Sequence, residues 1–295
     1  MAITLRQLEI FSLIATSGQA TTASRQLLIS QSAVSMALAE LERLTGAPLF
    51  ERHGKRLVLN DRGRLLVPEA QEIVSRAHAA EQMLREALDE PLGTIRVGAS
   101  TTIGNYLLPS LLAEFARRYP RATPQLQVAN TQQIEAAMES GELDVGLVEG
   151  PHHLASLQAS AWRDDELVVV VGRGHPWERE GTADGRMLAE AAWIMREKGS
   201  GTREVFEAAM AAQGIGHTVT LELGHTEAVK KAVEAGLGVS CLSRLAVQRE
   251  IEHGWLRGVT TPLDLRRRLT VLTRSERYRS KLLETFLAHL HTIGP

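Results

Sequence analysis

The stretch that most restricts the fold of this chain spans residues 29–45. Its apolar side chains recur at the spacing of a helix, so its polar side chains fall on the opposite side. The outward-facing positions on its first turns are Gln31, Ser32, Ser35 and Met36. Glutamine can form two hydrogen bonds with adenine in the major groove, and serine can bond to bases or phosphates. The stretch is therefore either a DNA-reading helix or an ordinary amphipathic helix capped near Ser30 or Gln31.

Two shorter helices are expected before this stretch. Apolar spacing predicts a helix that begins at Leu5 and ends near Gly18. Thr21 or Thr22 is expected to cap a second, short helix that runs through Leu27. A helix, a short helix, a tight connection and a longer helix form a helix-turn-helix, in which the last helix enters the major groove.

Residues 49–59 are predicted to form a basic wing, made of two short strands that turn at Gly54. Arg52, Lys55 and Arg56 lie near this turn and are either solvated or in contact with phosphates or a minor groove. Their place beside a helix-turn-helix favours DNA contact. The whole chain has a net charge of -2, but its first 64 residues hold eight basic and five acidic side chains. The candidate DNA-binding residues are Thr22, Gln31, Ser32, Ser35, Met36, Arg52, Lys55 and Arg56.

A long helix is expected next, from about Asp61 to Asp89, with Asn60 as its cap. Pro68 is tolerated if it lies within the first turns. A helix of this length spans roughly 40 Å and is apolar along one side. Because a small domain has little core to cover such a side, we expect a partner helix from a second subunit and therefore a dimer. The alternative is a helix that packs on its own chain.

The rest of the chain alternates strands and helices and predicts an α/β fold with a parallel sheet. The expected domains are a winged helix-turn-helix over 1–60, a linker helix over 61–90 and a two-lobed domain over 91–295. The lobes are expected at about 91–162 with 266–295, and at about 163–265; the first strand of the second lobe is expected at 166–171. The crevice between the strand ends of two such lobes is a natural ligand site.

Two loops, over 98–104 and 196–203, follow predicted strands and lead into helices. Each places hydroxyl groups and free N–H groups at a helix N-terminus, where the helix dipole favours an anion. Capping is the alternative role for either loop alone, but two such loops at one crevice favour anion binding. Lys198 or Arg203 can add a charge-assisted contact. The candidate effector-binding residues in these loops are Ser100, Thr101, Thr102, Ser200, Gly201, Thr202 and Arg203.

Three further candidates border the crevice. His225 and Thr226 open another predicted helix, which Thr226 can cap instead. Glu149 ends the last strand of the first lobe. It is either an exposed turn residue or a carboxylate that orients Arg203 or Lys198, or that recognises a ligand hydroxyl.

The sequence speaks against several other classes of protein. Its only cysteine, Cys241, is expected to be buried and inert. We expect no metal, no cofactor and no catalysis, because metal-ligand spacings and a nucleophile elbow are both missing. We also expect a cytoplasmic protein, since the sequence shows neither a signal segment nor a membrane span. The rival functions are a dehydratase-like enzyme acting on a small carboxylate and a solute-binding transport component.

The N-terminal segments 5–9, 30–35 and 49–52 resemble those of the LysR-type transcriptional regulators. Segments 99–106, 196–204 and 236–244 are similar to the CysL-like and YeiE-like branch of that family, which has carbon-fixation regulators nearby and is linked to sulfur metabolism.

The resemblance implies a periplasmic-binding-protein-like (type 2) effector domain and a tetramer built as a dimer of dimers. It implies that the protein binds double-stranded promoter DNA. It also implies that an effector in the crevice, such as sulfite or sulfate, changes how the protein bends that DNA. The resemblance further implies RNA polymerase as a candidate partner, and a location of the regulator in the bacterial nucleoid. Matching positions are Gln31, Ser32 and Ser35 for DNA, and Ser100, Thr102 and Thr202 for the effector. Ser32 stands where many relatives have Pro and Met36 where a basic side chain is common, so base preference does not carry over. His225 stands where some relatives have Asn, so the family's contact at that edge of the effector pocket does not carry over either.

Overall fold

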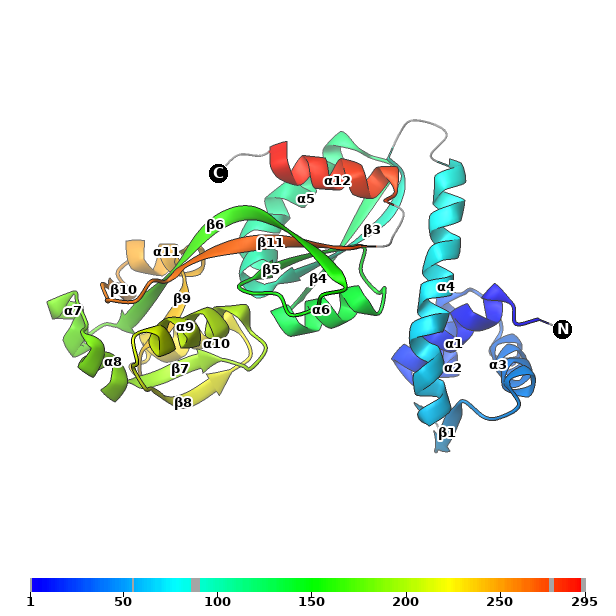
Figure 1. Ribbon diagram of the computed structural model, residues 1–295, viewed down its shortest axis with the longest axis horizontal. Helices are drawn as coiled ribbons and strands as arrows, with labels where there is room; N and C mark the ends of the chain where they lie inside the picture. The colour runs from blue at the N-terminus through cyan, green and yellow to red at the C-terminus, as the bar shows by residue number, and fades with distance from the viewer. Residues whose placement is uncertain (1, 55, 86–90, 276–278, 293–295) are drawn as a thin grey trace. The chain divides into compact units, whose positions relative to one another are not determined.

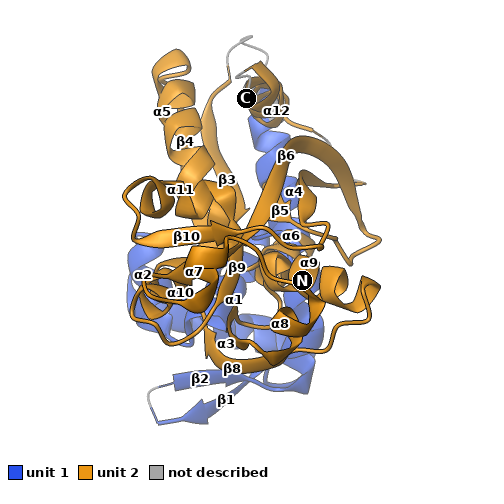
Figure 2. Ribbon diagram, turned by 90° about the vertical axis from the view of Figure 1, so that its left-hand side faces the viewer, with its two compact units in different colours: residues 1–89, 140–142 blue, residues 90–139, 143–295 orange. Residues whose placement is uncertain are grey.

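The computed structural model describes residues 2–54, 56–85, 91–275 and 279–292. The chain divides into two compact units (Figures 1 and 2), one holding residues 1–89 with 140–142 and the other holding the remainder. Within the described residues, no helix combines the length and the apolar character needed to span a membrane.

The N-terminal unit has the predicted order of helices followed by a hairpin (Figure 1). A buried apolar cluster, which includes Phe11, Val34 and Leu41, joins its first three helices to the hairpin and the long helix. The winged helix-turn-helix is therefore confirmed as one packed unit. Its elements are α1 (Leu5–Ser17), α2 (Ala20–Gln26), α3 (Gln31–Thr45), β1 (Phe50–His53), β2 (Arg56–Leu59) and α4 (Asp61–Arg85).

The ends of these helices follow from local side chains, with one correction. Ser30 caps α3, because its hydroxyl accepts a hydrogen bond from the Ala33 N–H at 3.2 Å. The prediction that Thr21 or Thr22 caps α2 is wrong. Both threonines lie inside the helix, and the capping position is Gln19, which makes no side-chain cap hydrogen bond.

The long helix α4 begins as predicted, since the Asn60 side chain accepts a hydrogen bond from the Gly63 N–H at 2.9 Å. Pro68 lies inside it. The described part ends at Arg85, so the predicted extension to Asp89 lies outside the described residues.

The first lobe of the larger unit is built on three parallel strands in the order β4-β3-β5, with β11 antiparallel to β5. Figure 1 shows α5 and α12 on one face of this sheet and α6 on the other. Its elements are β3 (Gly93–Ser100), the π-helix η2 (Ile103–Leu107), α5 (Leu108–Arg118), β4 (Ala122–Ala129), α6 (Thr131–Glu139), β5 (Val145–Glu149), β11 (Arg266–Arg274) and α12 (Lys281–Thr292).

The second lobe has its own apolar core around Trp193 and Phe206. β7 and β8 pair in parallel, and β9 and β10 pair antiparallel to β6. Its elements are α7 (Pro176–Glu180), α8 (Gly185–Glu190), β7 (Ala192–Arg196), α9 (Gly201–Ala212), β8 (Thr218–Leu223), α10 (Thr226–Glu234), β9 (Ser240–Ser243), α11 (Arg244–Glu252) and β10 (Leu256–Val259). The short elements α7, α8 and β10 were not predicted.

Two long antiparallel strands join the lobes. β6 (Leu157–Gly172) begins nine residues before the predicted strand, because residues 157–166 pair with β11 although most of their side chains are not buried. β6 and β11 run side by side from one core to the other (Figure 1) and are called the crossover strands below. The side chains where the lobes meet are therefore positioned by this pair.

Candidate DNA interface and effector site

The candidate DNA interface lies on α3 and the adjoining wing. The apolar side of α3 is buried at Val34 and Leu41, whereas its four candidate DNA-reading side chains are all exposed. The residues at this exposed face of α3 are Gln31, Ser32, Ser35 and Met36. A groove of about 570 Å³ runs between this face, the beginning of α2 and the wing. Its lining includes Gln31, Ser35, Arg52 and Arg56.

The wing supplies positive charge that other described residues do not neutralise. Arg52 and Arg56 are exposed, and neither forms an ion pair with a residue that the structure describes. Lys55 lies outside the described residues. Thr22 is half-buried in α2 and does not line the groove, whereas Thr21 does. Two free guanidinium groups beside an exposed polar helix face suit the backbone and base edges of a duplex.

The loops predicted at the crevice meet between the lobes. Arg196, at the end of β7, is buried and donates hydrogen bonds to the hydroxyls of Thr101 (3.2 Å) and Thr226 (3.1 Å). Thr101 belongs to the first lobe and Thr226 to the second. The guanidinium of Arg196 is held by Glu197 at 2.7 Å. Arg196 therefore bridges both lobes.

A second buried arginine, Arg267 on β11, organises the other half of this region. It forms ion pairs with Glu149 at 2.8 Å and with Asp165 at 2.6 Å. It also donates a hydrogen bond to the Thr202 hydroxyl at 2.9 Å. All three charged side chains are almost fully buried. We call Ser100, Thr101, Thr102, Glu149, Arg196, Thr202, Thr226 and Arg267 the interlobe cluster.

Glu149 is ionised within this cluster. Burial alone would raise the pKa of the Glu149 carboxyl. The charge of Arg267 and hydrogen bonds from the Thr202 hydroxyl and from the Thr102 N–H, at 2.7 Å, outweigh this effect and lower the pKa to about 2. The buried Ser100 hydroxyl lies beside the carboxylate and contributes to this lowering, although it makes no hydrogen bond of good geometry. Among the hydroxyls of the interlobe cluster, that of Ser100 is the one without a hydrogen bond of good geometry to a described residue.

Several predicted positions take other roles. Glu149 is neither exposed nor an orienting partner of Arg203; its partner is Arg267. Arg203 is held by Glu207 and Glu222, each at 2.6 Å, so it is already neutralised. Thr226 does not cap α10, because the capping position is His225 and the Thr226 hydroxyl accepts from Arg196.

The structure also places His225, Ser200 and Gly201. His225 is exposed and makes no cap hydrogen bond. Ser200 is buried at the N-cap of α9 and makes none either. Gly201 begins α9 against the end of β5, where a Cβ atom would lie 1.8 Å from the Glu149 carbonyl oxygen. The close approach of the two lobes therefore requires glycine at this position.

Sequence reasoning missed Arg196 and Arg267 as site residues, although each carried a signal. In a strand, alternate residues share a face, and Leu265 and Leu269 on either side of Arg267 are both buried. Arg267 is therefore the inward-facing member of the run Arg266–Arg268. Arg196 ends an apolar strand in which the three preceding side chains, of Trp193, Ile194 and Met195, are buried. A buried arginine needs partners, and it marks the place where polar groups meet.

Two family models match almost the whole chain. One, for the bacterial regulatory helix-turn-helix protein of the lysR family, matches residues 5–64, and the other, for the LysR substrate binding domain, matches residues 88–293. The chain belongs to the LysR-type transcriptional regulators. The α/β fold with an N-terminal helix-turn-helix and a two-lobed effector domain is thereby confirmed.

This LysR-type regulator is 42% identical to the HTH-type transcriptional regulator YeiE of Escherichia coli strain K12 over 288 residues, which cover 97% of each chain. It is 33% identical to the CcmR regulatory domain from Synechocystis PCC6803, solved in complex with 2-PG, with a TM-score of 0.63 over 68% of this chain and 96% of that one. A full-length OxyR from Pseudomonas aeruginosa shares the fold at 23% identity, with a TM-score of 0.77 over 99% and 94% of the chains.

The family favours a DNA-binding regulator over the dehydratase-like enzyme and the transport component, since its members are transcriptional regulators. Cys241 is buried, and burial raises the pKa of its thiol, so its predicted inert character is supported. Within the described residues, no group of three or more His, Cys, Asp or Glu side chains is arranged to hold a metal ion.

A histidine forms a further contact between the lobes of the regulator. His153, in the first lobe, lies 2.8 Å from Glu204 of α9 and 3.4 Å from Glu135 of α6. The hydrogen bond to Glu204, strengthened by the charges of both glutamates, raises the pKa of His153 above its usual 6.5. The protonated ring therefore attracts a carboxylate from each lobe.

We expect this contact to weaken as the pH rises. A raised pKa means that the stabilisation is complete below the usual pKa of 6.5 and is lost as the pH rises through the value in the folded protein. The midpoint of thermal unfolding should fall between about pH 6 and about pH 9 by more in the parent than in His153→Gln. Equal pH dependence in the two proteins would contradict the role given to His153. His152→Gln, at the neighbouring residue, is the matched control.

Proposed function

We propose that this LysR-type regulator controls transcription in response to a small anion, a sulfur oxyanion such as sulfite or sulfate, bound at the interlobe cluster. The observation that carries the proposal is the buried Ser100 hydroxyl, which lacks a well-formed hydrogen bond and lies where loops of both lobes meet. Buried polar groups normally have partners, so this hydroxyl is available to a ligand.

The groups around Ser100 suit an oxyanion. α9 begins at Gly201, and the first N–H groups of a helix have no partner within it, while the helix dipole is positive at this end. The Ser200 hydroxyl is not used for capping. The charge of Glu149 is partly offset by Arg267, which it shares with Asp165. Oxyanions accept several hydrogen bonds from hydroxyl and N–H donors of this kind.

Calorimetry of the full chain against sulfite, sulfate, phosphate and 2-PG tests the proposal. 2-PG is included because the CcmR regulatory domain was solved in complex with it. We expect a sulfur oxyanion to bind most tightly, and Ser100→Ala to weaken binding roughly tenfold, as expected for the loss of a hydrogen bond to a charged group. Ser110→Ala removes an exposed hydroxyl of α5 and is the matched control. Absence of binding by all four anions would refute the anion-sensing mechanism.

We further propose the boundaries 1–60, 61–90 and 91–295 for the winged helix-turn-helix, the linker helix and the effector domain. α4 exposes Leu65, Ile73 and Leu84, of which Leu65 and Leu84 are 75% exposed. Such apolar side chains support a partner helix from a second subunit, and thus a dimer within a dimer of dimers. The proposed site of action is double-stranded promoter DNA in the bacterial nucleoid, with RNA polymerase as a candidate partner.

The candidate DNA contacts make two distinguishable predictions. Arg52→Ala should weaken binding to all sequences and reduce the slope of affinity against salt by about one, because one phosphate contact is lost. Gln31→Ala should instead cost about 1–3 kcal/mol on the preferred operator alone, because a base contact is lost. Arg43→Ala is the matched control, since Glu40 already pairs with Arg43 at 2.6 Å. If Arg52→Ala and Gln31→Ala both bind operator like the parent, the assigned interface is wrong.

A further inference from the structure

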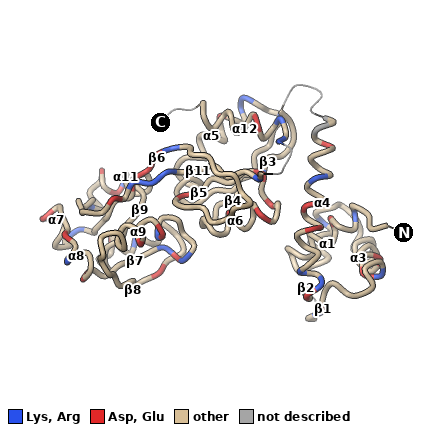
Figure 3. The backbone as a smooth tube through the Cα atoms, viewed as in Figure 1, with Lys and Arg blue, Asp and Glu red and all other residues tan. Residues whose placement is uncertain are grey.

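A second pocket lies on the crossover strands beside the interlobe cluster, with which it shares Arg267. Its volume is about 880 Å³, within the range of ligand sites in proteins. It is formed by β6, β11 and the beginning of α11, and Figure 3 shows basic residues of β11 beside acidic residues of β6 in this region. We call it the crossover pocket. Its lining residues are Asp164, Asp165, Glu166, Arg244, Leu245, Gln248, Asp264, Arg266, Arg267 and Arg268.

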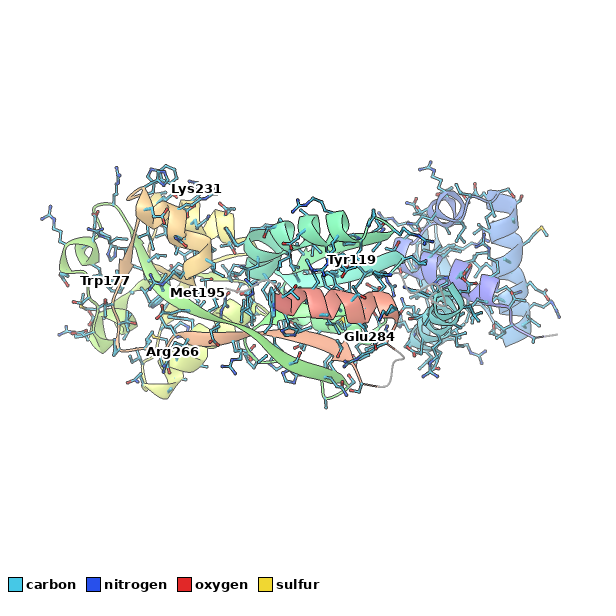
Figure 4. The ribbon with its side chains drawn as sticks, turned by 90° about the horizontal axis from the view of Figure 1, so that it is seen from above. Tyr119, Trp177, Met195, Lys231, Arg266 and Glu284 are labelled. Carbon is cyan, nitrogen blue, oxygen red and sulfur yellow. The ribbon has the colours of Figure 1, made fainter. Side chains whose placement is uncertain are left out.

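The exposed arginines of β11 in the crossover pocket point away from the interlobe cluster, whereas the buried Arg267 belongs to both. Arg266, Arg267 and Arg268 pair in register with Glu166, Asp165 and Asp164. Successive side chains of a strand point to opposite faces. Arg267 contacts Thr202 in the interlobe cluster, so Arg266 and Arg268 lie on the other face, and Arg266 (labelled in Figure 4) is largely exposed.

The charges of the pocket are balanced and, outside the Arg267 pair, accessible. Its lining holds four arginines and four carboxylates. Three ion pairs lie at the exposed positions, namely Arg244 with Glu166 at 3.1 Å, Arg266 with Asp264 at 2.8 Å and Arg268 with Asp164 at 3.1 Å. Exposed pairs of this kind contribute little to stability, so a ligand can replace one partner at small cost.

We propose that the crossover pocket binds a zwitterionic α-amino acid. A ligand with a single charge would meet as many like charges as opposite ones in this lining. A zwitterion can place its carboxylate on a guanidinium, a geometry that allows two parallel hydrogen bonds, and its ammonium on a neighbouring carboxylate. Leu245 and Gln248 of α11 then face the ligand side chain with an apolar and an amide group. The same strands carry Asp165 and Arg267, so the ligand would contact the backbone that positions the interlobe cluster.

The test uses the full chain and each of the standard amino acids as probe, with acetate and ethylammonium as ligands of a single charge. We expect at least one amino acid to raise the thermal unfolding midpoint and to give a calorimetric isotherm, with both single-charge ligands roughly tenfold weaker or more. Arg266→Ala and Asp264→Ala should each weaken that amino acid roughly tenfold. Arg186→Ala, which breaks an exposed pair with Glu190 outside the pocket, should bind it like the parent.

Three results would overturn the proposal: no binding by any amino acid, acetate or ethylammonium binding as tightly as the amino acid, or unchanged affinity in both Arg266→Ala and Asp264→Ala. Ser100→Ala should leave amino-acid binding unchanged, because Ser100 does not line the crossover pocket. Loss of amino-acid binding in Ser100→Ala would place the ligand in the interlobe cluster instead and would also refute the assignment. The outcome does not depend on which anion the regulator senses.

Discussion

Arg267→Met is expected to destabilise the effector domain by about 3–5 kcal/mol, because it leaves Glu149 and Asp165 as buried carboxylates without their cation. Urea unfolding followed by tryptophan fluorescence measures the effect. The four tryptophans of the chain all lie at or beyond position 162, so their signal reports on the effector domain and not on the helix-turn-helix.

The dependence on pH gives this prediction a second readout. In the parent, the lowered pKa of Glu149 means that its stabilisation is present above the usual value of 4.5 and is lost as the pH falls towards 2. In Arg267→Met, protonation of Glu149 removes a charge that has lost its partner, so the destabilisation should be smaller near pH 5 than near pH 8.

Arg268→Met is the control for Arg267→Met, because it removes the same kind of side chain from the next position of β11. Arg268 pairs with an exposed aspartate on the other face of the strands, and its replacement should cost about 0–1 kcal/mol. Equal losses in the two variants would show that the buried ion pairs are not the cause.

Gly201→Ala is expected to separate the lobes at the interlobe cluster. A Cβ atom at this position would lie 1.8 Å from the Glu149 carbonyl oxygen and 2.8 Å from the Thr131 hydroxyl, and the first of these is backbone that cannot rotate away. α9 must therefore retreat from β5, which takes Thr202 away from Glu149. Forced overpacking costs about 1–3 kcal/mol, which, if it falls on the bound state, would weaken anion binding by roughly 5- to 150-fold.

Gly216→Ala is the matched control for Gly201→Ala, since a Cβ atom there meets nothing within 4 Å. Calorimetry with the anion that binds the parent compares the two variants, and tryptophan fluorescence checks that both remain folded. If Gly201→Ala binds the anion like the parent, close contact between α9 and β5 is not required for the site.

The order of most elements could be predicted from periodicity and caps. α3 and the wing were found because apolar spacing and turn residues act locally, as at Ser30 and Gly54. The first half of β6 could not be found in this way. It is held by its ladder with β11, about 100 residues away in sequence, and its side chains do not show the pattern of a buried strand.

The candidate site was predictable only in part. Its hydroxyl loops were recognised because serine, threonine and glycine after a strand are informative wherever they occur. The ion-pair partners of the charged residues could not be recognised from the sequence. Arg203 was expected to meet a ligand but is neutralised by Glu207 and Glu222, whereas Arg267 was overlooked and pairs with Glu149 and Asp165.

A winged helix-turn-helix, a long helix and a two-lobed α/β domain could be predicted from the sequence, because spacing, caps and turns depend on near neighbours along the chain. The exposed polar face of α3 was predicted in the same way. Which charged side chains meet depends on the three-dimensional fold. Ion pairs between residues far apart in the chain, such as Glu149 with Arg267, depend on strand register and on how the lobes close, and neither can be read from local patterns. The same register turns Arg266 and Arg268 away from the buried partners of Arg267 and brings them together with Glu166 and Asp164 in the crossover pocket.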